Sequence, residues 1–169
     1  MQLEQLVKDI VMDGVSFPPV DVTDICTHSG DVTDGSLFVA IYGTDIDGHD
    51  FIPQAIDNGA SAIISNGREL GILPVPNIKV ANPRPAVSRV AAEYYGHPTQ
   101  ELTVIGITGT NGKTTTASIL NKIMKSADIQ TAQLGTLGII ADGFTPEKTL
   151  TTPDPISLQK TFRALADKG

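Results

Sequence analysis

The sequence has little cysteine, few aromatic residues and little positive charge, and each shortage excludes a class of protein. Cys26 is the one cysteine among 169 residues, which excludes an internal disulfide or a cysteine-based zinc site and favours a cytoplasmic setting. We expect its thiol to be a buried spectator rather than a nucleophile. Aromatic residues make up 5% of the chain and tryptophan is absent, so the cores must be built mainly from Ile, Val, Leu and Ala.

Basic residues are outnumbered by acidic ones. The chain has 12 Lys and Arg against 19 Asp and Glu, which gives a formal net charge of −7. A nucleic-acid binder needs clustered Lys and Arg to contact phosphates, and no basic stripe is found, so we expect no nucleic-acid partner. ATP binding remains open, because backbone dipoles and a single lysine can hold a nucleotide's phosphates whatever the global charge.

Long apolar runs are also missing. None approaches the roughly 20 residues that a membrane-spanning helix needs, and Met1–Gln5 lacks the basic and apolar regions of a signal peptide. Hydrophobic residues nevertheless make up 40% of the chain and charged residues 18%, which is typical of a folded globular protein. We therefore expect a cytoplasmic protein with no membrane span.

Predicted strands and helices alternate along the chain, which indicates an α/β fold with parallel sheets. A change in sequence character near residues 98–101 suggests a boundary between a small mixed-sheet domain at 1–98 and a second, parallel-sheet domain that begins at 99. In the first domain, hydrophobic spacing predicts helices at 3–10, at 51–56 with an end at Gly59, and at 85–95. The strands predicted there are 20–26, 37–41, 62–65 and 77–80.

Beyond the boundary, the pattern predicts a strand at 102–108, a helix at 113–126, a strand at 131–134 and a helix at 156–167. About 70 residues follow the boundary, whereas a nucleotide-binding α/β domain usually needs on the order of 150. The second domain, at 99–169, is therefore expected to be the truncated first part of a P-loop ATPase domain.

A glycine-rich segment joins the strand predicted at 102–108 to the helix that follows. In Gly109–Thr114 the glycines allow a tight turn that points several N–H groups at one anion, and the helix start adds its positive dipole end. Lys113 supplies an ammonium group for the β- and γ-phosphates, and Thr114 offers a hydroxyl to Mg²⁺. The pattern departs from the commonest form, because Ile107 stands where a glycine is usual. A turn that merely caps a helix is the plainer alternative, but it leaves the lysine and the threonines after it unexplained.

The segment Gly109–Thr115 resembles the ATP loop of the Mur ligases, the ATP-dependent amide-forming enzymes of peptidoglycan precursor synthesis. Folylpolyglutamate and cyanophycin synthetases have a similar loop, so other segments must choose among them. Gly35–Ala40 and Asp47–Ile52 resemble the N-terminal UDP-binding domain of the muramoyl-peptide synthetases. Tyr94–Pro98 resembles the stop before their ATP loop.

A second group of segments resembles one type within the family. The segments Gly135–Gly138, Leu150–Pro155 and Leu158–Gln159 are similar to the MurE type, which adds a diamino acid to UDP-N-acetylmuramoyl-L-alanyl-D-glutamate through an acyl phosphate. The resemblance implies ATP and Mg²⁺ as cofactors, and the muramoyl dipeptide and a diamino acid as partners. This sequence departs from the family's pattern at His28–Gly30, where the usual residues are Asp-Ser-Arg.

The resemblance also implies a set of site residues. ATP would be bound by Gly109, Thr110, Asn111, Gly112, Lys113, Thr114 and Thr115, with Lys113 as the catalytic residue and Thr114 as the metal ligand. The muramoyl substrate would be bound by Thr27, Ser29, Thr44, Asp45, Ile46, Thr151 and Thr152.

Plainer roles remain open for several of these side chains. Ser29 can equally be a turn serine, and Thr151 and Thr152, taken alone, can be a turn before a proline. His49 stands between aspartates, but no second histidine lies at ligand spacing, so we expect a structural role rather than a metal site.

Three rival functions also remain. The first is MurF or another ligase of the same family, and the second is a non-catalytic module that binds a nucleotide or a UDP-sugar. The third is a small P-loop kinase, which would need neither Leu37–Ile52 nor Thr151–Thr152. The family's acidic Mg²⁺ ligand, modified lysine and C-terminal domain are not found in the chain. We therefore expect no amide formation by the chain alone, and weak ATP binding if the second domain folds.

Overall fold

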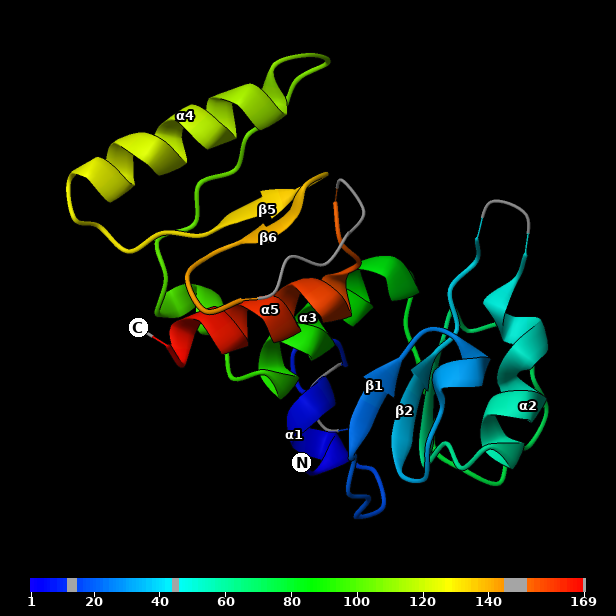
Figure 1. Cartoon of the computed structure of the whole chain (residues 1–169). Helices are drawn as coiled ribbons and strands as arrows, with labels where there is room; N and C mark the ends of the chain where they lie inside the picture. Colours follow the sequence, from blue (N-terminus) through cyan, green and yellow to red (C-terminus); the bar gives the residue numbers. More distant parts are fainter. Residues whose placement is uncertain (12–14, 44–45, 145–151, 169) are drawn as a thin grey trace. The chain divides into compact units, whose positions relative to one another are not determined.

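The computed structural model describes residues 1–11, 15–43, 46–144 and 152–168. They form two compact units, Met1–Gly96 and His97–Gly169. Strands and helices alternate in the first unit, as the α/β prediction requires (Figure 1). No helix within the described residues is both long enough and apolar enough to cross a membrane.

The first unit is built on one four-stranded sheet. Its strands lie in chain order, β1 (Asp24–Cys26), β2 (Ser36–Val39), β3 (Ala62–Ser65) and β4 (Asn77–Lys79), and neighbouring strands are parallel throughout. The sheet is thus parallel rather than mixed, and antiparallel pairing among the described residues of this unit is limited to isolated bridges. Parallel order follows because each strand is connected to the next by a crossover that returns the chain to the same end of the sheet.

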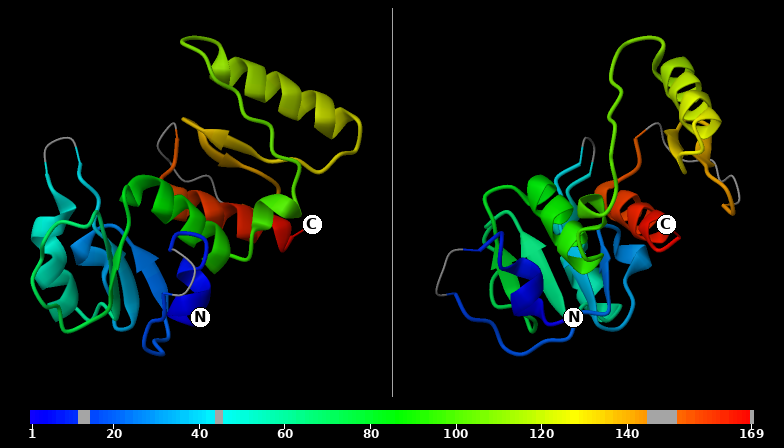
Figure 2. Two further views of the ribbon diagram at one scale, coloured as in Figure 1. Left: turned by 180° about the vertical axis from the view of Figure 1, so that it is seen from behind. Right: turned by 90° about the vertical axis from the view of Figure 1, so that its left-hand side faces the viewer.

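Helices cover both faces of this sheet. The helix α2 (Ile52–Asp57) lies on one side, and α1 (Leu3–Val7) and α3 (Pro83–Tyr94) lie on the other (Figures 1 and 2). Two short 3₁₀ turns, η1 (Ser29–Asp31) and η2 (Gly48–Phe51), precede strand β2 and helix α2. The connections between the strands contain only short helical elements, which fits the small size of the unit.

Local signals explain where these helices begin and end. The side chain of Asn82 caps α3 by accepting a hydrogen bond from the N–H of Arg84, and Pro83 occupies the first turn, where its missing N–H costs nothing. Gly59 follows the last residues of α2 with a φ of +104°, the left-handed conformation expected after a helix. The predicted end of this helix is confirmed.

The core of the first unit is closed. Side chains alternate along β2, so Phe38 and Ala40 face α2 together with Ile63, whereas Leu37 and Val39 are buried on the opposite face. The α2-facing cluster also contains Cys26, which is 5% exposed. The predicted burial of this thiol is confirmed, and its lack of a chemical role stays a prediction.

The second unit contains η3 (Pro98–Gln100), α4 (Lys113–Ser126), a hairpin of β5 (Gln133–Gly135) and β6 (Gly138–Ile140), and α5 (Pro155–Ala166). The prediction for α4 is confirmed with the same bounds, and α5 begins one residue before the predicted start. Arg163 of α5 donates to both carboxylate oxygens of Glu101, at 2.6 and 3.0 Å, and this pairing lowers the pKa of Glu101. The ion pair fastens α5 to the start of this unit.

The strand predicted at 102–108 is wrong. These residues form no strand, and none of the strands in the described part of the chain pairs with them. Val104 and Ile105 are 52% and 56% exposed. The apolar, β-branched run has the composition of a strand, but a strand is stable only beside a neighbour that completes its hydrogen bonds.

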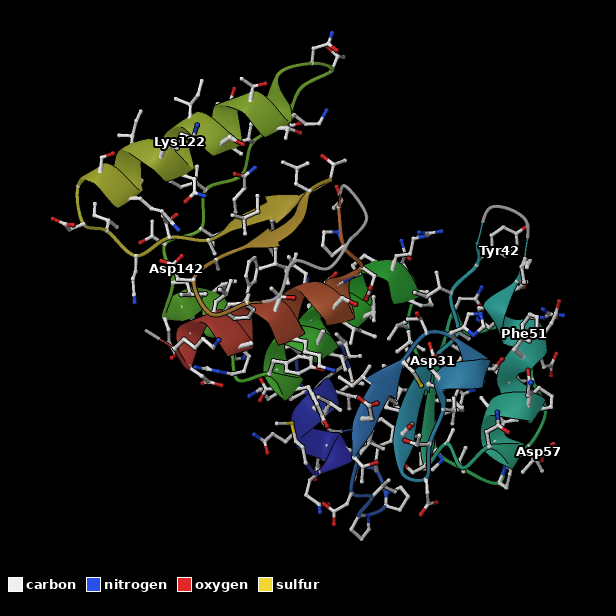
Figure 3. All side chains as sticks on the ribbon, in the orientation of Figure 1. Asp31, Tyr42, Phe51, Asp57, Lys122 and Asp142 are labelled. Carbon is white, nitrogen blue, oxygen red and sulfur yellow. The ribbon has the colours of Figure 1, made fainter. Side chains whose placement is uncertain are left out.

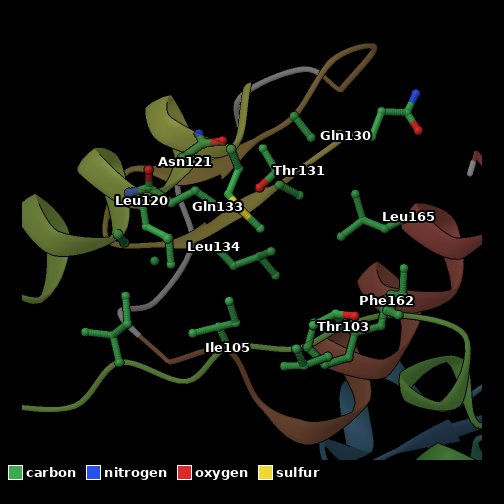
Figure 4. A pocket seen from close by; sticks show the side chains of 18 of the residues that line it. Thr103, Ile105, Leu120, Asn121, Gln130, Thr131, Gln133, Leu134, Phe162 and Leu165 are labelled. Atoms are coloured by element: carbon green, nitrogen blue, oxygen red, sulfur yellow. The ribbon is translucent and has the colours of Figure 1, made fainter. Parts of the chain in front are cut away.

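An open apolar cavity takes the place of a closed core in the second unit. It measures about 870 Å³ and is bordered by residues 101–109, α4, the hairpin and α5. Figure 4 shows Leu120 from α4, Leu134 from β5, and Phe162 and Leu165 from α5 around this space. Neither α4 nor α5 has a fully buried residue. Less apolar surface is removed from water here than in the first unit, so this unit gains less hydrophobic stabilisation.

Amide hydrogen exchange should therefore differ between the two units. Amides of β2 and β3 should exchange at least about 100-fold more slowly than amides in the middle of α4, because local opening requires less free energy where fewer contacts are buried. Exchange of the 169-residue chain in D₂O, followed by mass spectrometry of peptides, measures this. Equal protection of β2 and α4 would contradict it.

The thiol of Cys26 should react slowly in the folded chain. Burial raises its pKa from 9.0 to about 12, and the thiolate is the reactive form, so alkylation by iodoacetamide at pH 8 should be roughly 1,000-fold slower than in urea. Since the folded pKa is the higher one, this group's contribution to stability is fully present below pH 9 and is lost as the pH rises toward 12. Equal alkylation rates with and without urea would contradict the assignment.

Candidate functional site

The segment 109–115 turns directly into α4. Gly112 is the N-cap residue, with a φ of +80°, and Gly109 has a φ of +150°. Both values lie where residues with a Cβ are strained, so the glycines permit this turn. Because Gly112 has no side chain, no side-chain cap satisfies the first N–H groups of α4.

Backbone N–H groups of the first turn of α4 are left for a ligand. The first main-chain hydrogen bond at this end runs from the N–H of Thr116 to the carbonyl of Gly112, at 2.9 Å. The N–H groups of residues 113–115 precede it and have no partner inside the helix. Together with the positive end of the helix dipole, they form a site suited to an anion.

A small cavity of about 290 Å³ lies over this turn. Residues Thr110–Thr115 line it, and Thr136 from the tip of the β5–β6 hairpin closes one side. Sequence reasoning did not identify Thr136 as a site residue. The sequence places it between two glycines, in the segment Gly135–Gly138 noted above for its family resemblance, but neither signal reveals that the turn lies beside the phosphate loop.

The ammonium group of Lys113 lies at the mouth of the loop. Its Nζ donates to the carbonyl of Gly109 at 2.6 Å and to that of Thr110 at 3.5 Å. No carboxylate among the described residues forms an ion pair with it. The positive charge is thus held near the loop amides and is not neutralised by an acid.

The hydroxyl of Thr114 faces that of Thr136. Their Oγ1 atoms are 3.2 Å apart, so one of the two hydroxyls donates to the other. Hydroxyl oxygens suit a hard cation such as Mg²⁺. The described residues hold no group of three or more His, Cys, Asp or Glu side chains placed to bind a metal, so a cation here would depend on phosphate oxygens for most of its charge. The loop amides, the ammonium group and the hydroxyls therefore fit a Mg²⁺–nucleotide better than a free metal ion.

Thr152 belongs to the same unit. It lines the larger cavity, and so do Lys113 and Thr114. Its side chain is exposed, so it faces a cavity that two residues of the phosphate loop also line. The neighbouring Thr151, also predicted as a substrate residue, lies outside the described residues.

The other predicted substrate residues belong to the first unit. Thr27 is exposed just after β1. Ser29 is only 6% exposed, and its hydroxyl donates to Oε1 of Gln54 at 2.8 Å, so its side chain has a structural partner. Ile46 is 63% exposed. Thr44 and Asp45 lie outside the described residues.

Polar contacts fix the end of the segment that carries Ile46. Asp47 accepts hydrogen bonds from the backbone N–H of His49 at 3.0 Å and from Arg68 at 3.0 Å, and the first of these is the main cause that lowers its pKa. The buried ring of His49 bonds Asp47 through Nδ1 at 2.6 Å and accepts the N–H of Asn66 through Nε2 at 3.1 Å. Both ring nitrogens therefore have structural partners, the role expected for His49.

Figure 3 shows Tyr42 at the edge of this unit, away from its sheet.

Two family models match separate parts of the chain. The model described as Mur ligase family, catalytic domain, matches residues 21–95, and the Mur ligase middle domain matches residues 107–169. The phosphate loop and Thr152 fall in the second match, and Thr27, Ser29 and Ile46 fall in the first.

Two relatives that share one name match nearly the whole of this chain. It is 43% identical over 171 residues to a UDP-N-acetylmuramoyl-L-alanyl-D-glutamate–2,6-diaminopimelate ligase of Bacillus velezensis, covering 99% of this chain and 34% of that protein. The protein of the same name from Oceanobacillus iheyensis is 35% identical over 170 residues, with 99% and 34% covered. The chain thus spans about a third of the length of these relatives.

Solved structures agree on the fold. A structure of a UDP-N-acetylmuramoyl-L-alanyl-D-glutamate–2,6-diaminopimelate ligase matches 100% of this chain and 34% of its own, with a TM-score of 0.70 and 24% identity. The MurF ligase of Thermotoga maritima in complex with ADP matches 80% of this chain and 28% of its own, with a TM-score of 0.54 and 28% identity. The two family models together take in most of the sequence, and the chain belongs to the Mur ligase family.

Proposed function

We propose that the whole protein is an ATP-dependent ligase that adds a diamino acid to UDP-N-acetylmuramoyl-L-alanyl-D-glutamate in the cytoplasm. The observation that carries the proposal is the uncapped start of α4, where free N–H groups and the ammonium of Lys113 converge on one small cavity. The 43% identity to a ligase that acts with 2,6-diaminopimelate supports the choice of substrates. The chain also resembles the MurF ligase of Thermotoga maritima, at 28% identity. A MurF-type ligase would use the same chemistry on a different acceptor, so MurF remains the second candidate.

The proposed reaction has two steps. A carboxylate oxygen of the muramoyl dipeptide attacks the γ-phosphorus of ATP and the bond to the β-phosphate oxygen breaks, which gives an acyl phosphate and ADP. The amine of the diamino acid then attacks the acyl carbon, loses a proton and displaces inorganic phosphate. Phosphoryl transfer needs positioning and charge neutralisation more than covalent participation by the protein.

The loop residues would divide this work. The N–H groups of residues 113–115 would hold phosphate oxygens, with Gly109–Gly112 shaping the turn around them. The ammonium of Lys113 would neutralise charge that develops on the γ-phosphate, and Thr114 would ligate Mg²⁺. A Mg²⁺ ion held by Thr114 would supply further neutralisation of phosphate charge.

The two units would bind opposite ends of the reactants. We assign residues 1–98 to the UDP end of the muramoyl substrate, through Thr27, Ser29 and the segment 44–46, and residues 99–169 to ATP. Thr151 and Thr152 would contact the muramoyl peptide near the reacting carboxylate. The position of Thr152 on the cavity that Lys113 and Thr114 also line supports this assignment.

Removing the ammonium of Lys113 should weaken nucleotide binding. Lys113→Ala should lower the affinity for Mg-ATP about 100-fold, because a charge-assisted contact to phosphate contributes on the order of 2–3 kcal/mol. Isothermal calorimetry on the 169-residue chain measures the change.

Lys122→Ala is the matched control for this variant. It removes the same charge from an exposed position on the same helix, visible in Figure 3, outside the phosphate-loop cavity. It should bind Mg-ATP like the unmodified chain. Equal losses in both variants would mean that net charge, not the loop, sets the affinity, and equal affinity in all three proteins would contradict the loop assignment.

Thr152→Val should weaken binding of the muramoyl substrate and leave ATP binding unchanged. Loss of one hydroxyl that bonds a charged or polar ligand should lower the affinity for UDP-N-acetylmuramoyl-L-alanyl-D-glutamate about tenfold. Titration of that compound by calorimetry checks this, with Thr161→Val as the control, since the hydroxyl of Thr161 bonds its own helix at the carbonyl of Ser157. Unchanged affinity in Thr152→Val would remove this residue from the substrate site.

A further inference from the structure

The loop at 41–48 leads from β2 into η2 and carries Ile46, one of the residues assigned above to the UDP end of the substrate. Two backbone hydrogen bonds join its described arms. The N–H of Gly48 donates to the carbonyl of Ile41 at 2.9 Å, and the N–H of Gly43 donates to the carbonyl of Ile46 at 2.8 Å. A Cβ on Gly48 would lie 2.7 Å from the same carbonyl oxygen of Ile41, so the arms are in direct contact. These bonds hold the arms together, and contacts beyond the loop set where it lies.

The ring of His49 joins the end of this loop to the sheet. Its side chain is 0% exposed, and its Nε2 accepts the backbone N–H of Asn66, the residue after β3, at 3.1 Å. Because a backbone N–H can only donate, Nε2 carries no proton. The ring proton is therefore on Nδ1, which donates to Oδ1 of Asp47, 2.6 Å away. A single neutral imidazole thus bonds both the loop and the carboxyl end of β3.

Two exposed arginines also contact the loop. Arg68 is 50% exposed and donates to Asp47 at 3.0 Å and to Asp50 at 3.2 Å. Arg84 is exposed as well and donates to the carbonyl of Tyr42 at 2.9 Å. Water competes for exposed ion pairs and hydrogen bonds, so each contributes little, whereas the bonds of a buried ring meet no such competition. The histidine is therefore the main fastening of the loop.

We propose that His49 is a positioning residue for the uridine-nucleotide end of the substrate, because the bond from Asn66 to its ring holds the 41–48 loop in place at the carboxyl end of the sheet. The inference rests on the proposed function and deepens it. Ligands of open parallel sheets bind at the carboxyl ends of the strands, and Thr27, which directly follows β1, lies at the same end. The buried ring cannot touch a ligand itself, so it acts through the loop and through Ile46, which is 63% exposed.

Two substitutions of His49 separate the two bonds of its ring. His49→Gln places an amide oxygen close to the position of Nε2 and can still accept the N–H of Asn66, whereas His49→Asn keeps only a donor for Asp47. His49→Asn should lower the affinity of the 169-residue chain for UDP-N-acetylmuramoyl-L-alanyl-D-glutamate about tenfold, and His49→Gln should restore it to within about threefold. Both variants should bind Mg-ATP like the unmodified chain. Calorimetry measures the affinities, and the melting temperature reports whether each variant keeps its fold.

Arg68→Gln is the matched control, since it removes the exposed partner of Asp47 and leaves the buried ring in place. It should bind the muramoyl compound within about twofold of the unmodified chain. A loss in Arg68→Gln as large as that in His49→Asn would mean that the ion pair holds the loop, and the inference would be wrong.

Amide exchange in the absence of ligand tests the positioning by itself. The N–H groups of Gly43 and Gly48 should exchange about tenfold faster in His49→Asn than in the unmodified chain, while the amides of β2 keep their rates. NMR of the labelled chain in D₂O follows each amide. Equal acceleration of the loop and of β2 would show that the ring only stabilises the whole unit, and would overturn the inference.

The outcomes distinguish the inference from the proposed function. If the unmodified chain binds the muramoyl compound and His49→Asn binds it equally well, the inference alone is wrong. If the unmodified chain does not bind this compound at all, the substrate assignment of the first unit fails and the inference fails with it.

Discussion

At the start of α4, a glycine with no side chain leaves the first N–H groups of a 14-residue helix without an internal partner. The proposed nucleotide binding and phosphoryl transfer depend on that unsatisfied turn. A capping side chain would have completed its hydrogen bonds and closed the site, whereas Gly112 keeps it open for an anion. Lys113, held 2.6 Å from the carbonyl of Gly109, then adds a full positive charge at the same point. The acidic balance of the chain matters little here, because the ligand meets local dipoles and one ammonium group.

The two units differ in how completely their side chains are packed. The first unit has a closed core around a four-stranded parallel sheet. Polar contacts also hold its loops, since His49 and Arg68 both bond Asp47. The second unit leaves an apolar cavity between its helices and its hairpin. Polar contacts hold its parts together at separate places: Gln133 and Ser118 join the hairpin to α4, and Arg163 joins α5 to Glu101.

Much of this could be predicted from the sequence, where local signals and tertiary structure agree. The bounds of α4, the end of α2 at Gly59 and the buried thiol of Cys26 followed from helix-end signals and composition. The strand predicted at 102–108 was wrong. Its apolar, β-branched residues favour a strand, but a strand forms only where a neighbouring strand pairs with it. The mixed sheet expected for the first unit proved parallel, since pairing direction depends on crossovers rather than on strand composition. The contact of Thr136 with the phosphate loop could not be inferred from the sequence, because only the position of the hairpin on α4 brings this residue beside Thr114.

The central claim is that backbone N–H groups at the start of α4 bind the nucleotide's phosphates, and amide NMR during titration with ADP and Mg²⁺ tests it most directly. We predict that the largest ¹H–¹⁵N shifts fall on residues 109–115, with smaller changes at the hairpin tip and none in the sheet of the first unit. Shifts that spread evenly over the chain, or that leave the amides of 112–115 unmoved while ADP binds, would contradict the account.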